Sequence, residues 1–183
     1  MVHVSPAAVQ PYDYANKMRQ PRVEKVVVNI GVGEGGEKLI KAEKVLGMVT
    51  GKKPVRTLAK QPNREWALRK GAPIGCKVTM RGEDAVSFLK KAFDVRNNKM
   101  PWYHFDDEGN LNFGIPDYTD FAGMKYDPDI GIFGMNITAV ITRPGARVKQ
   151  RRLLKARVGK SHRLPREEAQ SFVHSAFGVE VVE

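Results

Sequence analysis

Three glycines between a predicted strand and a predicted helix have the spacing of a dinucleotide-binding fingerprint. Gly31, Gly33 and Gly36 in NIGVGEGGEKL match G-x-G-x-x-G, in which the backbone of a tight turn approaches a pyrophosphate. The next predicted strand, KPVRTLAK, has no acidic residue at its carboxyl end for a ribose, and the segment after it is a poor crossover helix. Arg56 or Lys60 could contact a 2′-phosphate, so an NADP-dependent enzyme stays open as a minor alternative.

Metal binding and acid–base chemistry would need clustered histidine, cysteine or aspartate residues. The chain has one cysteine, Cys76, and its histidines are scattered: His3, His104, His162 and His174. No zinc-site spacing results. Six aspartates between residues 106 and 129 could hold magnesium in a nuclease, but the turn-forming residues around them favour turns and loops. We expect no catalytic residue, no metal and no cofactor, and we predict that the protein is not an enzyme.

Basic residues are the most prominent group that could bind a partner. The 183 residues include 31 Lys and Arg against 20 Asp and Glu, which gives a net charge of +11. This charge favours nucleic acid over an anionic membrane surface as the partner. Residues 143–166 hold ten basic side chains and no acidic one, a density at which like charges repel unless a polyanion neutralises them. A solvated flexible arm is the alternative interpretation of this segment.

The stretch IGCKVTMRG, residues 74–82, alternates two kinds of residue with the period of a strand. One set is apolar and includes Cys76 and Val78, which predicts a buried thiol. The other set is Lys77, Thr79 and Arg81, and it could offer positive charge and hydrogen-bond donors to an RNA. A hydrated sheet face without a partner is the alternative, because antiparallel sheets often expose one face.

The elements that position these residues follow from periodicity and from turn formers. We predict strands at 22–33, 53–59, 74–82, 111–115 and 135–142, and helices at 37–51, 83–93 and 164–178. The apolar stripes of the three helices are, in order, Leu39, Ala42, Leu46 and Val49; Ala85, Phe88, Leu89 and Ala92; and Ala169, Phe172, Val173 and Ala176. The fold class is therefore α+β, with a mainly antiparallel sheet, helices on one face and the other face open for RNA.

One domain over residues 1–183 is expected, because no linker separates two cores. It carries a long loop at 60–73 between the second and third strands and the basic segment at 143–166. The start of the chain lacks a targeting pattern, and no apolar run is long enough to span a membrane. A single cysteine fits a reducing compartment, so we expect a cytosolic protein.

Five blocks of the sequence resemble one known family in their order and approximate spacing. They are NKMRQPRVEKVVVNIGVGEGGEKL, TGKKPVRTLAK, GAPIGCKVTMRG, GNLNFGI and GMNITAVIT. Together they are similar to the fifth large-subunit ribosomal protein family, which is numbered eleven in eukaryotes. RPGARVKQRR and GKSHRLPREEA resemble its archaeal and eukaryotic branch, because the bacterial members end soon after the last strand.

The resemblance implies that the protein binds 5S rRNA in the central protuberance of the large subunit through its exposed sheet face. The matching positions are Asn29, Thr57, Lys77, Thr79 and Arg81. Lys52, where we expect Gln in bacterial members, is added to this set. The further partners that it implies are 23S-type rRNA, other large-subunit proteins of the central protuberance and a small-subunit protein at an intersubunit bridge. The expected location is the cytoplasm, in the ribosome and not at a membrane.

The resemblance also implies that the long loop reaches the peptidyl-site tRNA. Candidate contacts in it are Gln61, Asn63, Arg64, Arg69 and Lys70. Trp66 in the same loop would either stack on a base or anchor the loop against the domain. Additional basic RNA contacts are expected from Arg143, Arg147, Lys149, Arg151 and Arg152. A regulatory RNA-binding protein outside the ribosome would use the same surfaces and is the other alternative.

Overall fold

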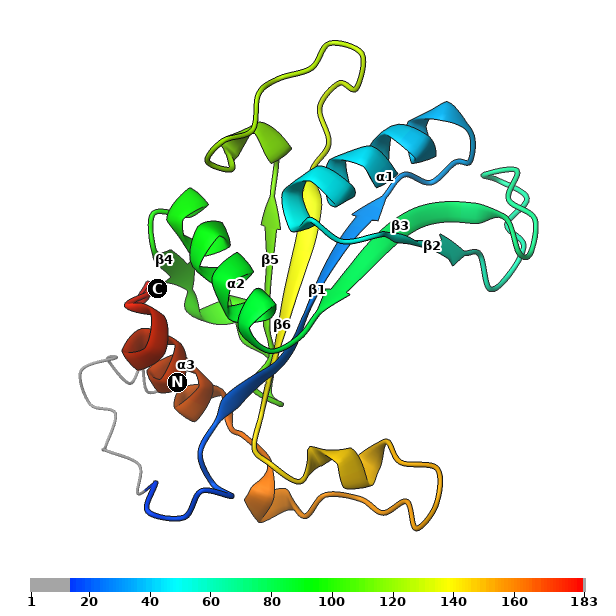
Figure 1. Ribbon diagram of the computed structural model, residues 1–183. Coiled ribbons are helices and arrows are strands. Elements are labelled where there is room, and N and C mark those ends of the chain that lie inside the picture. Colours follow the sequence, from blue (N-terminus) through cyan, green and yellow to red (C-terminus); the bar gives the residue numbers. More distant parts are fainter. Residues whose placement is uncertain (1–13, 183) are drawn as a thin grey trace. The chain divides into compact units, whose positions relative to one another are not determined.

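The computed structural model describes residues 14–182 (Figure 1). His3 lies outside this range. So does most of the N-terminal stretch for which we expect no targeting pattern. The described residues form two compact units, one made of 14–25, 81–112 and 139–182 and the other of 26–80 and 113–138. The single domain expected over residues 1–183 stays a prediction. None of the helices within residues 14–182 combines the length and the apolar character needed to cross a membrane.

The described residues form a five-stranded sheet with the order β2-β3-β1-β6-β5. Its strands are β1 (Arg22–Gly31), β2 (Val55–Leu58), β3 (Pro73–Met80), β5 (Leu111–Ile115) and β6 (Met135–Thr142). β3 lies between β1 and β2 and is antiparallel to both. The α+β class with a mainly antiparallel sheet is confirmed, as are all five predicted strands to within a few residues.

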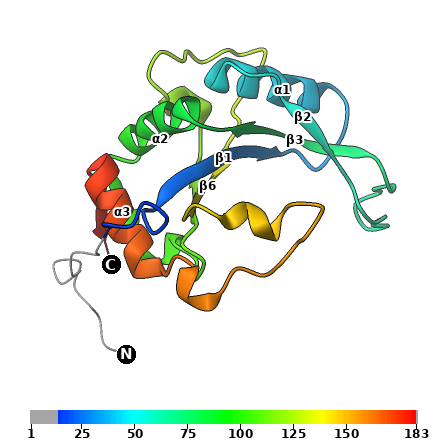
Figure 2. The ribbon, with the colours of Figure 1, turned by 60° about the horizontal axis from the view of Figure 1, so that its bottom comes forward.

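Helix α1 (Glu37–Thr50) packs against β3 in the unit formed by 26–80 and 113–138 (Figure 1, Figure 2). It ends as predicted at Gly51, which adopts the left-handed conformation with φ 66° and donates its N–H to Gly47 O. The buried face consists of Leu39, Ala42, Val45 and Leu46. Val45 extends the predicted stripe, and Val49, which we assigned to it, is only half-buried because it lies in the last turn of the helix.

The other unit contains α2 (Glu83–Val95), α3 (Arg166–Phe177) and a parallel pair of short strands, β4 (Lys99–Pro101) and β7 (Glu180–Val182). The predicted stripe of α2 is buried, and Phe93 extends it. α2 continues to Val95, two residues beyond the predicted end. In α3, Ala169 and Val173 are buried as predicted, Ala176 is exposed, and the acidic Glu168 is buried instead.

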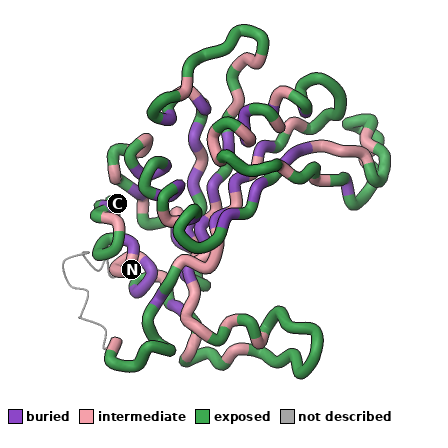
Figure 3. The backbone as a smooth tube through the Cα atoms, in the orientation of Figure 1, coloured by how far each residue is buried: buried purple, intermediate pink, exposed green. Residues whose placement is uncertain are grey.

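Burial along the strands follows the alternation that the sequence shows (Figure 3). In β6 the buried residues are Met135, Ile137, Ala139 and Ile141, and in β3 they include Cys76, Val78 and Met80. The intervening side chains are exposed or half-buried. One face of the sheet therefore carries the core, and the opposite face is open.

Candidate nucleic-acid interface

The open face is defined most clearly where β1 and β3 pair. Asn29 lies opposite Lys77, and Val27 lies opposite Thr79. Residues that are directly opposite in an antiparallel pair point to the same face, so Asn29, Lys77 and Thr79 share one surface. The alternate pair Val28 and Val78 is buried on the core face. The predicted division of this strand into two faces is confirmed.

β2 adds Thr57 to the open face and turns Arg56 away from it. Thr57 lies opposite Gly75, and Arg56 lies opposite the buried Cys76. Arg56 instead binds Glu43 of α1 with two hydrogen bonds, Nε to Oε1 at 2.5 Å and Nη2 to Oε2 at 3.1 Å. These hydrogen bonds and the positive charge lower the pKa of Glu43, although burial opposes the shift. Alternation alone left the facing of β2 open, and its pairing with β3 decides it.

Gly75 and Gly31 pair at the end of β1, where neither strand carries a side chain on the open face. The two residues lie opposite each other in the β1–β3 pair. A Cβ atom on Gly75 would lie 2.8 Å from Ile30 O and 3.0 Å from Thr57 Oγ1, so this position has no room for a side chain. A Cβ on Gly31 would meet nothing within 4 Å. Thr57 lies beside this glycine pair, and Asn29 and Lys77 form the next pair of the open face along the strands.

Two further polar residues on the open face were missed in the sequence. Asn136 is exposed and Thr138 is half-buried on β6, between the buried Met135, Ile137 and Ala139. A Cβ atom on Gly114 of β5 would lie 3.4 Å from Asn136 Oδ1. Gly114 and Asn136 are therefore neighbours on the two strands. The alternation in MNITAVIT could have identified both residues, because it separates the two faces as clearly as IGCKVTMRG does.

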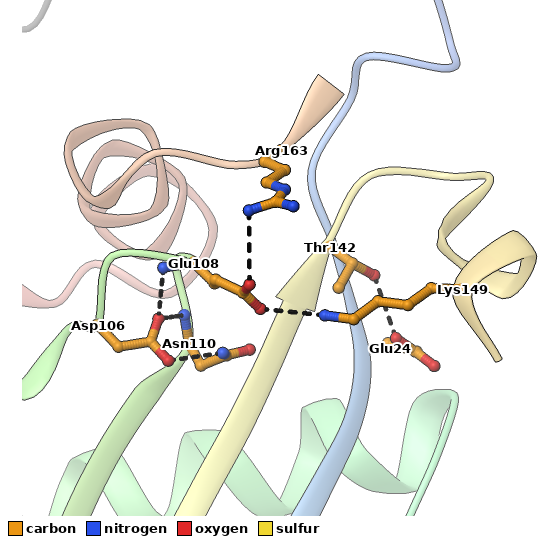
Figure 4. Close-up of polar contacts among 7 residues, drawn as sticks. All are labelled: Glu24, Asp106, Glu108, Asn110, Thr142, Lys149 and Arg163. Atoms are coloured by element: carbon orange, nitrogen blue, oxygen red, sulfur yellow. Dashed lines mark hydrogen bonds and ion pairs between the residues drawn. The ribbon is translucent and has the colours of Figure 1, made fainter. Parts of the chain in front are cut away.

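Arg81 and Lys52 lie outside the strands. Arg81 follows β3, belongs to the unit that contains α2, and has a side chain that is 61% exposed. Its Nη1 is 3.9 Å from Glu24 Oε1, and the other oxygen of Glu24 accepts a hydrogen bond from Thr142 Oγ1 at 3.4 Å (Figure 4). Lys52 is an exposed residue in the turn after α1. A cation at each position is accessible to a phosphate.

The loop at 60–73 is a folded hairpin. Asn63 and Leu68 exchange both backbone hydrogen bonds, at 3.0 and 2.8 Å. Asn63 Oδ1 also accepts the N–H of Glu65 at 2.9 Å, so this predicted contact residue has a structural role in the turn. Ala59 N donates to Ala72 O, and Gly71 N donates to Ala59 O, both at 2.9 Å. These bonds close the base of the hairpin.

The tip of this hairpin presents exposed side chains. Trp66 is 71% exposed, so it does not anchor the loop against the domain, which was one of its two interpretations. The predicted contacts Gln61, Arg64, Arg69 and Lys70 are also exposed. The hairpin therefore offers an aromatic ring and cations at one end of the unit that contains α1.

The basic segment is tied to the protein at both of its ends. The guanidinium of Arg143, at the end of β6, forms an ion pair with the buried carboxylate of Glu168 in α3. Arg143 Nη1 donates to Ser161 O at 3.2 Å, and His162 Nε2 lies 2.9 Å from Pro144 O. The side chain of Arg143 is only 11% exposed, so we do not retain it as an RNA contact. Nothing in the sequence around Arg143 predicts this partner, which lies 25 residues away.

Acidic residues neutralise several other cations of this segment. Glu108 lies 3.4 Å from Lys149 Nζ and 3.9 Å from Arg163 Nη1 (Figure 4). Asp107 Oδ1 accepts a hydrogen bond from Arg166 Nη2 at 2.7 Å. The expectation that only an external polyanion could neutralise this block is wrong for these residues. Arg147, Arg151 and Arg152 are exposed and remain candidates for RNA contacts.

The glycine fingerprint does not lie in a dinucleotide-binding arrangement. In such a fold the strand that follows the first helix is parallel to the first strand and beside it. Here β3 lies between β1 and β2 and is antiparallel to both. Gly33 and Gly36 have φ values of 82° and 100°, so they are needed for the turn that leads into α1. Arg56, a candidate for a 2′-phosphate, binds Glu43.

The aspartates between 106 and 129 build turns, as predicted. Asp106 Oδ1 accepts the N–H groups of Glu108 and Asn110 at 3.0 and 2.7 Å (Figure 4). Asp117 and Asp127 each accept a backbone N–H two residues ahead. Within residues 14–182 there is no group of three or more His, Cys, Asp or Glu residues that could hold a metal ion.

Cys76 is fully buried, as predicted from its place in the apolar set of β3. Burial is the main cause that raises the pKa of its thiol to about 11, and the negative charge of Glu43 adds to the shift. The thiol is therefore protonated at neutral pH and is a component of the core.

His104 is a partly buried side chain. Burial and the positive charge of Arg96 both lower its pKa.

The geometry defines an α+β protein that offers an open sheet face, an exposed hairpin and a basic loop to a polyanion. Comparison with known proteins agrees with this class. Residues 16–69 match the family described as ribosomal protein L5, and residues 73–174 match the model for the C-terminus of the same ribosomal family.

Relatives with the name large ribosomal subunit protein uL5 match almost the whole chain. The one from Thermoplasma volcanium is 52% identical over 168 residues, which are 91% of this chain and 99% of that protein. The one from Methanococcoides burtonii is 47% identical over 167 residues, with the same coverage of 91% and 99%. The chain belongs to the ribosomal protein L5 family, and these relatives are archaeal, as the basic segment indicated.

Proposed function

We propose that the protein is a structural, non-catalytic constituent of the large ribosomal subunit that binds 5S rRNA in the central protuberance. The observation that carries the proposal is the shared surface of Asn29, Thr57, Lys77 and Thr79, which the pairing of β1, β2 and β3 places on the open face. Amide, hydroxyl and ammonium groups on a sheet can contact phosphates and 2′-hydroxyl groups, which distinguish an RNA by its shape. Its place in the ribosomal protein L5 family supports the assignment.

The hairpin at 60–73 has a different role in this proposal. It contacts the peptidyl-site tRNA through Arg64, Arg69 and Lys70, with Trp66 stacked on a base or ribose. The backbone hydrogen bonds at its base hold the hairpin in a defined form, and its tip is exposed. A preformed hairpin loses little conformational entropy when it binds, so a small contact can suffice.

The remaining contacts proposed are with 23S-type rRNA, with neighbouring large-subunit proteins and with a small-subunit protein at an intersubunit bridge. The exposed cations Arg147, Arg151 and Arg152 are the candidates for these additional rRNA phosphates, whereas Arg81 and Lys52 stay candidates for 5S rRNA. The protein would thus act in the cytoplasm as part of the ribosome.

A competition experiment tests the 5S assignment. The purified protein is titrated with labelled 5S rRNA from Thermoplasma volcanium and with an RNA hairpin of equal length, at several salt concentrations. We expect tight binding of 5S rRNA and weak binding of the hairpin, and no saturable binding of NADPH. Equal binding of both RNAs in moderate salt would refute the proposal, because bulk charge alone would then explain the affinity.

A further inference from the structure

The loop that connects β6 to α3 carries two exposed leucines at its far end. Leu153 is 76% exposed and Leu154 is 84% exposed. Both lie in the sequence RRLLKAR, which spans residues 151–157. Burial of a leucine side chain is favourable, and two adjacent leucines at this exposure form an apolar tip in an otherwise basic segment.

The turn that presents these leucines is held by specific contacts. Arg151 Nε donates to Leu154 O at 2.8 Å, and Arg151 N donates to Arg147 O at 2.9 Å. Ala156 N donates to Val148 O at 3.2 Å and so joins the two sides of the loop. Leu154 has a φ of 50°, in the left-handed region that disfavours a leucine, so the contacts around it maintain this conformation.

The base of the same loop is fixed to the protein. Arg143 joins the end of β6 to Glu168 of α3 and to Ser161 O, and His162 lies beside Pro144 O. Figure 2 shows the segment as a closed loop that leaves the end of β6 and returns toward α3. The leucines are therefore carried on a loop with both ends tied, in contrast to the flexible arm that the sequence left as an alternative.

The charges around the tip indicate what it binds. The acids that pair with this segment, Asp107, Glu108 and Glu168, bind Arg143, Lys149, Arg163 and Arg166, which lie nearer to its two ends. Arg152, Lys155 and Arg157 flank the leucines and are exposed, and no acidic residue occurs between 143 and 166. A tip with apolar side chains at its centre and cations around it complements an RNA that exposes unstacked bases between phosphates.

We propose that residues 151–157 form a leucine-tipped basic finger that binds an unpaired, unstacked region of ribosomal RNA. Leu153 and Leu154 contact the faces of bases or riboses, and Arg152, Lys155 and Arg157 contact the flanking phosphates. The proposal rests on the proposed function, because it takes ribosomal RNA as the partner. The proposal goes beyond that function because it assigns an apolar contact to this segment. The charge of the segment by itself predicts only nonspecific binding to phosphates.

The test separates the apolar contact from the ionic one. The variants are Leu153→Ser/Leu154→Ser, Arg152→Ala/Lys155→Ala, and Ile132→Ser as the control for loss of an exposed apolar side chain in the other unit, where it is 67% exposed. Each is titrated with protein-free 5S rRNA and with protein-free large-subunit rRNA from Thermoplasma volcanium over a range of salt. A milder variant, Leu153→Ala/Leu154→Ala, replaces the serine variant if thermal unfolding shows a loss of stability.

We expect the leucine variant to bind at least one of the two RNAs about fivefold or more weakly, with an unchanged salt slope, because no phosphate contact is removed. The Arg152→Ala/Lys155→Ala variant should lower the salt slope by roughly 1.5 to 2 units. Ile132→Ser should bind like the wild type.

If the leucine variants bound both RNAs with wild-type affinity, the proposal of an RNA-binding finger would be overturned. If such a variant bound RNA normally but failed to remain in large subunits, the tip would be a protein-docking site, which also overturns the proposal. These results are distinct from failure of the proposed function. In that case the wild-type protein itself would not prefer 5S rRNA to a hairpin of equal length.

Discussion

Lys77 on β3 lies directly opposite Asn29 on β1, and both side chains stand on the open face of the sheet. The residue next to Lys77, Val78, lies opposite Val28 with both side chains in the core. Two neighbouring positions in the chain thus put a candidate RNA contact and a core residue on opposite faces. This separation makes the interface testable by single substitutions.

Val78→Ala and Lys77→Ala should have opposite effects. Val78→Ala removes buried methyl groups and should lower the free energy of unfolding by about 1 to 3 kcal/mol, with RNA binding affected only through the folded fraction. Lys77→Ala should leave stability nearly unchanged and should lower the salt slope of 5S rRNA binding by about one unit. Denaturant unfolding and salt-dependent titration of the same two variants measure both. If Lys77→Ala unfolds the protein with an unchanged salt slope, the assignment of the open face is wrong.

Gly75→Ala should destabilise the sheet, and Gly31→Ala is its matched control. A Cβ on Gly75 would be too close to Ile30 O and Thr57 Oγ1, so β2 or β1 must move, at a cost of about 1 to 3 kcal/mol. Gly31 lies directly opposite, has open space around its Cβ position and should tolerate alanine with little change. Urea midpoints of the two variants provide the comparison. Equal midpoints would contradict the close approach at Gly75.

Replacing residues 63–70 by a short Gly-Ser link should leave the fold and 5S binding near normal. The hairpin closes through its own backbone bonds, and its tip is exposed, so its removal does not open the core. In assembled ribosomes the same variant should weaken protection of the peptidyl-site tRNA from chemical probes. Trp66→Ala should give a smaller effect in the same assay without loss of stability. Loss of 5S binding by a folded loop variant would show that the hairpin and the sheet do not have separate roles.

Glu168→Ala should be strongly destabilising, because it leaves Arg143 buried without its ion-pair partner. The expected loss in the free energy of unfolding is about 3 to 5 kcal/mol, whereas replacing both residues, as Arg143→Met/Glu168→Leu, should recover much of it. Glu167→Ala, at an exposed neighbouring position, is the control. Denaturant unfolding of the wild type and the three variants measures these differences. A Glu168→Ala variant as stable as Glu167→Ala would mean that the pair does not fix the loop.

The ion pair between Glu43 and Arg56 should contribute to the acid dependence of stability. Arg56 lowers the pKa of Glu43 in the folded protein from its ordinary value of 4.5. A carboxyl group with a lowered folded pKa stabilises the fold fully above its unfolded pKa, and the contribution is lost as the pH falls through the folded value. Stability of the wild type should therefore fall more than that of Arg56→Ala between about pH 5.5 and pH 3.

Urea midpoints across this pH range measure the difference between the wild type and Arg56→Ala. The control is Lys44→Ala, which removes an exposed cation from α1, the helix that carries Glu43. Parallel pH profiles for the wild type and Arg56→Ala would show that the pair does not persist in solution. An identical shift in the Lys44→Ala profile would assign the effect to general charge instead of to this pair.

Local patterns predicted most of the fold, because their causes lie within a few residues. The alternation in 74–82 and 135–142 identified both strands, and Gly51 and Gly178 marked helix ends that the structure places at the same residues. β4 and β7 were missed, because three-residue strands have too little periodicity to identify and depend on each other for pairing.

What the sequence could not decide at the site has nonlocal causes. The register between β2 and β3 places Thr57 on the open face, as expected, and turns Arg56 away from it. Arg143 turns inward because of a carboxylate on a distant helix. Asn136 and Thr138 were within reach of the sequence and were overlooked. The assignments of Asn29, Lys77 and the hairpin residues to particular RNAs stay predictions.

Glu108 lies beside two cations of the basic segment, Lys149 and Arg163, on a side chain that is itself 54% exposed. The ten cations of residues 143–166 therefore overstate the attraction of this segment for a polyanion, because the nearby Glu108 offsets part of their charge. We expect a phosphate that binds either cation to compete with this carboxylate. An RNA that makes few other contacts should therefore bind more weakly than an RNA that fits the whole surface, and the segment should discriminate against nonspecific RNA more than its count of basic residues suggests.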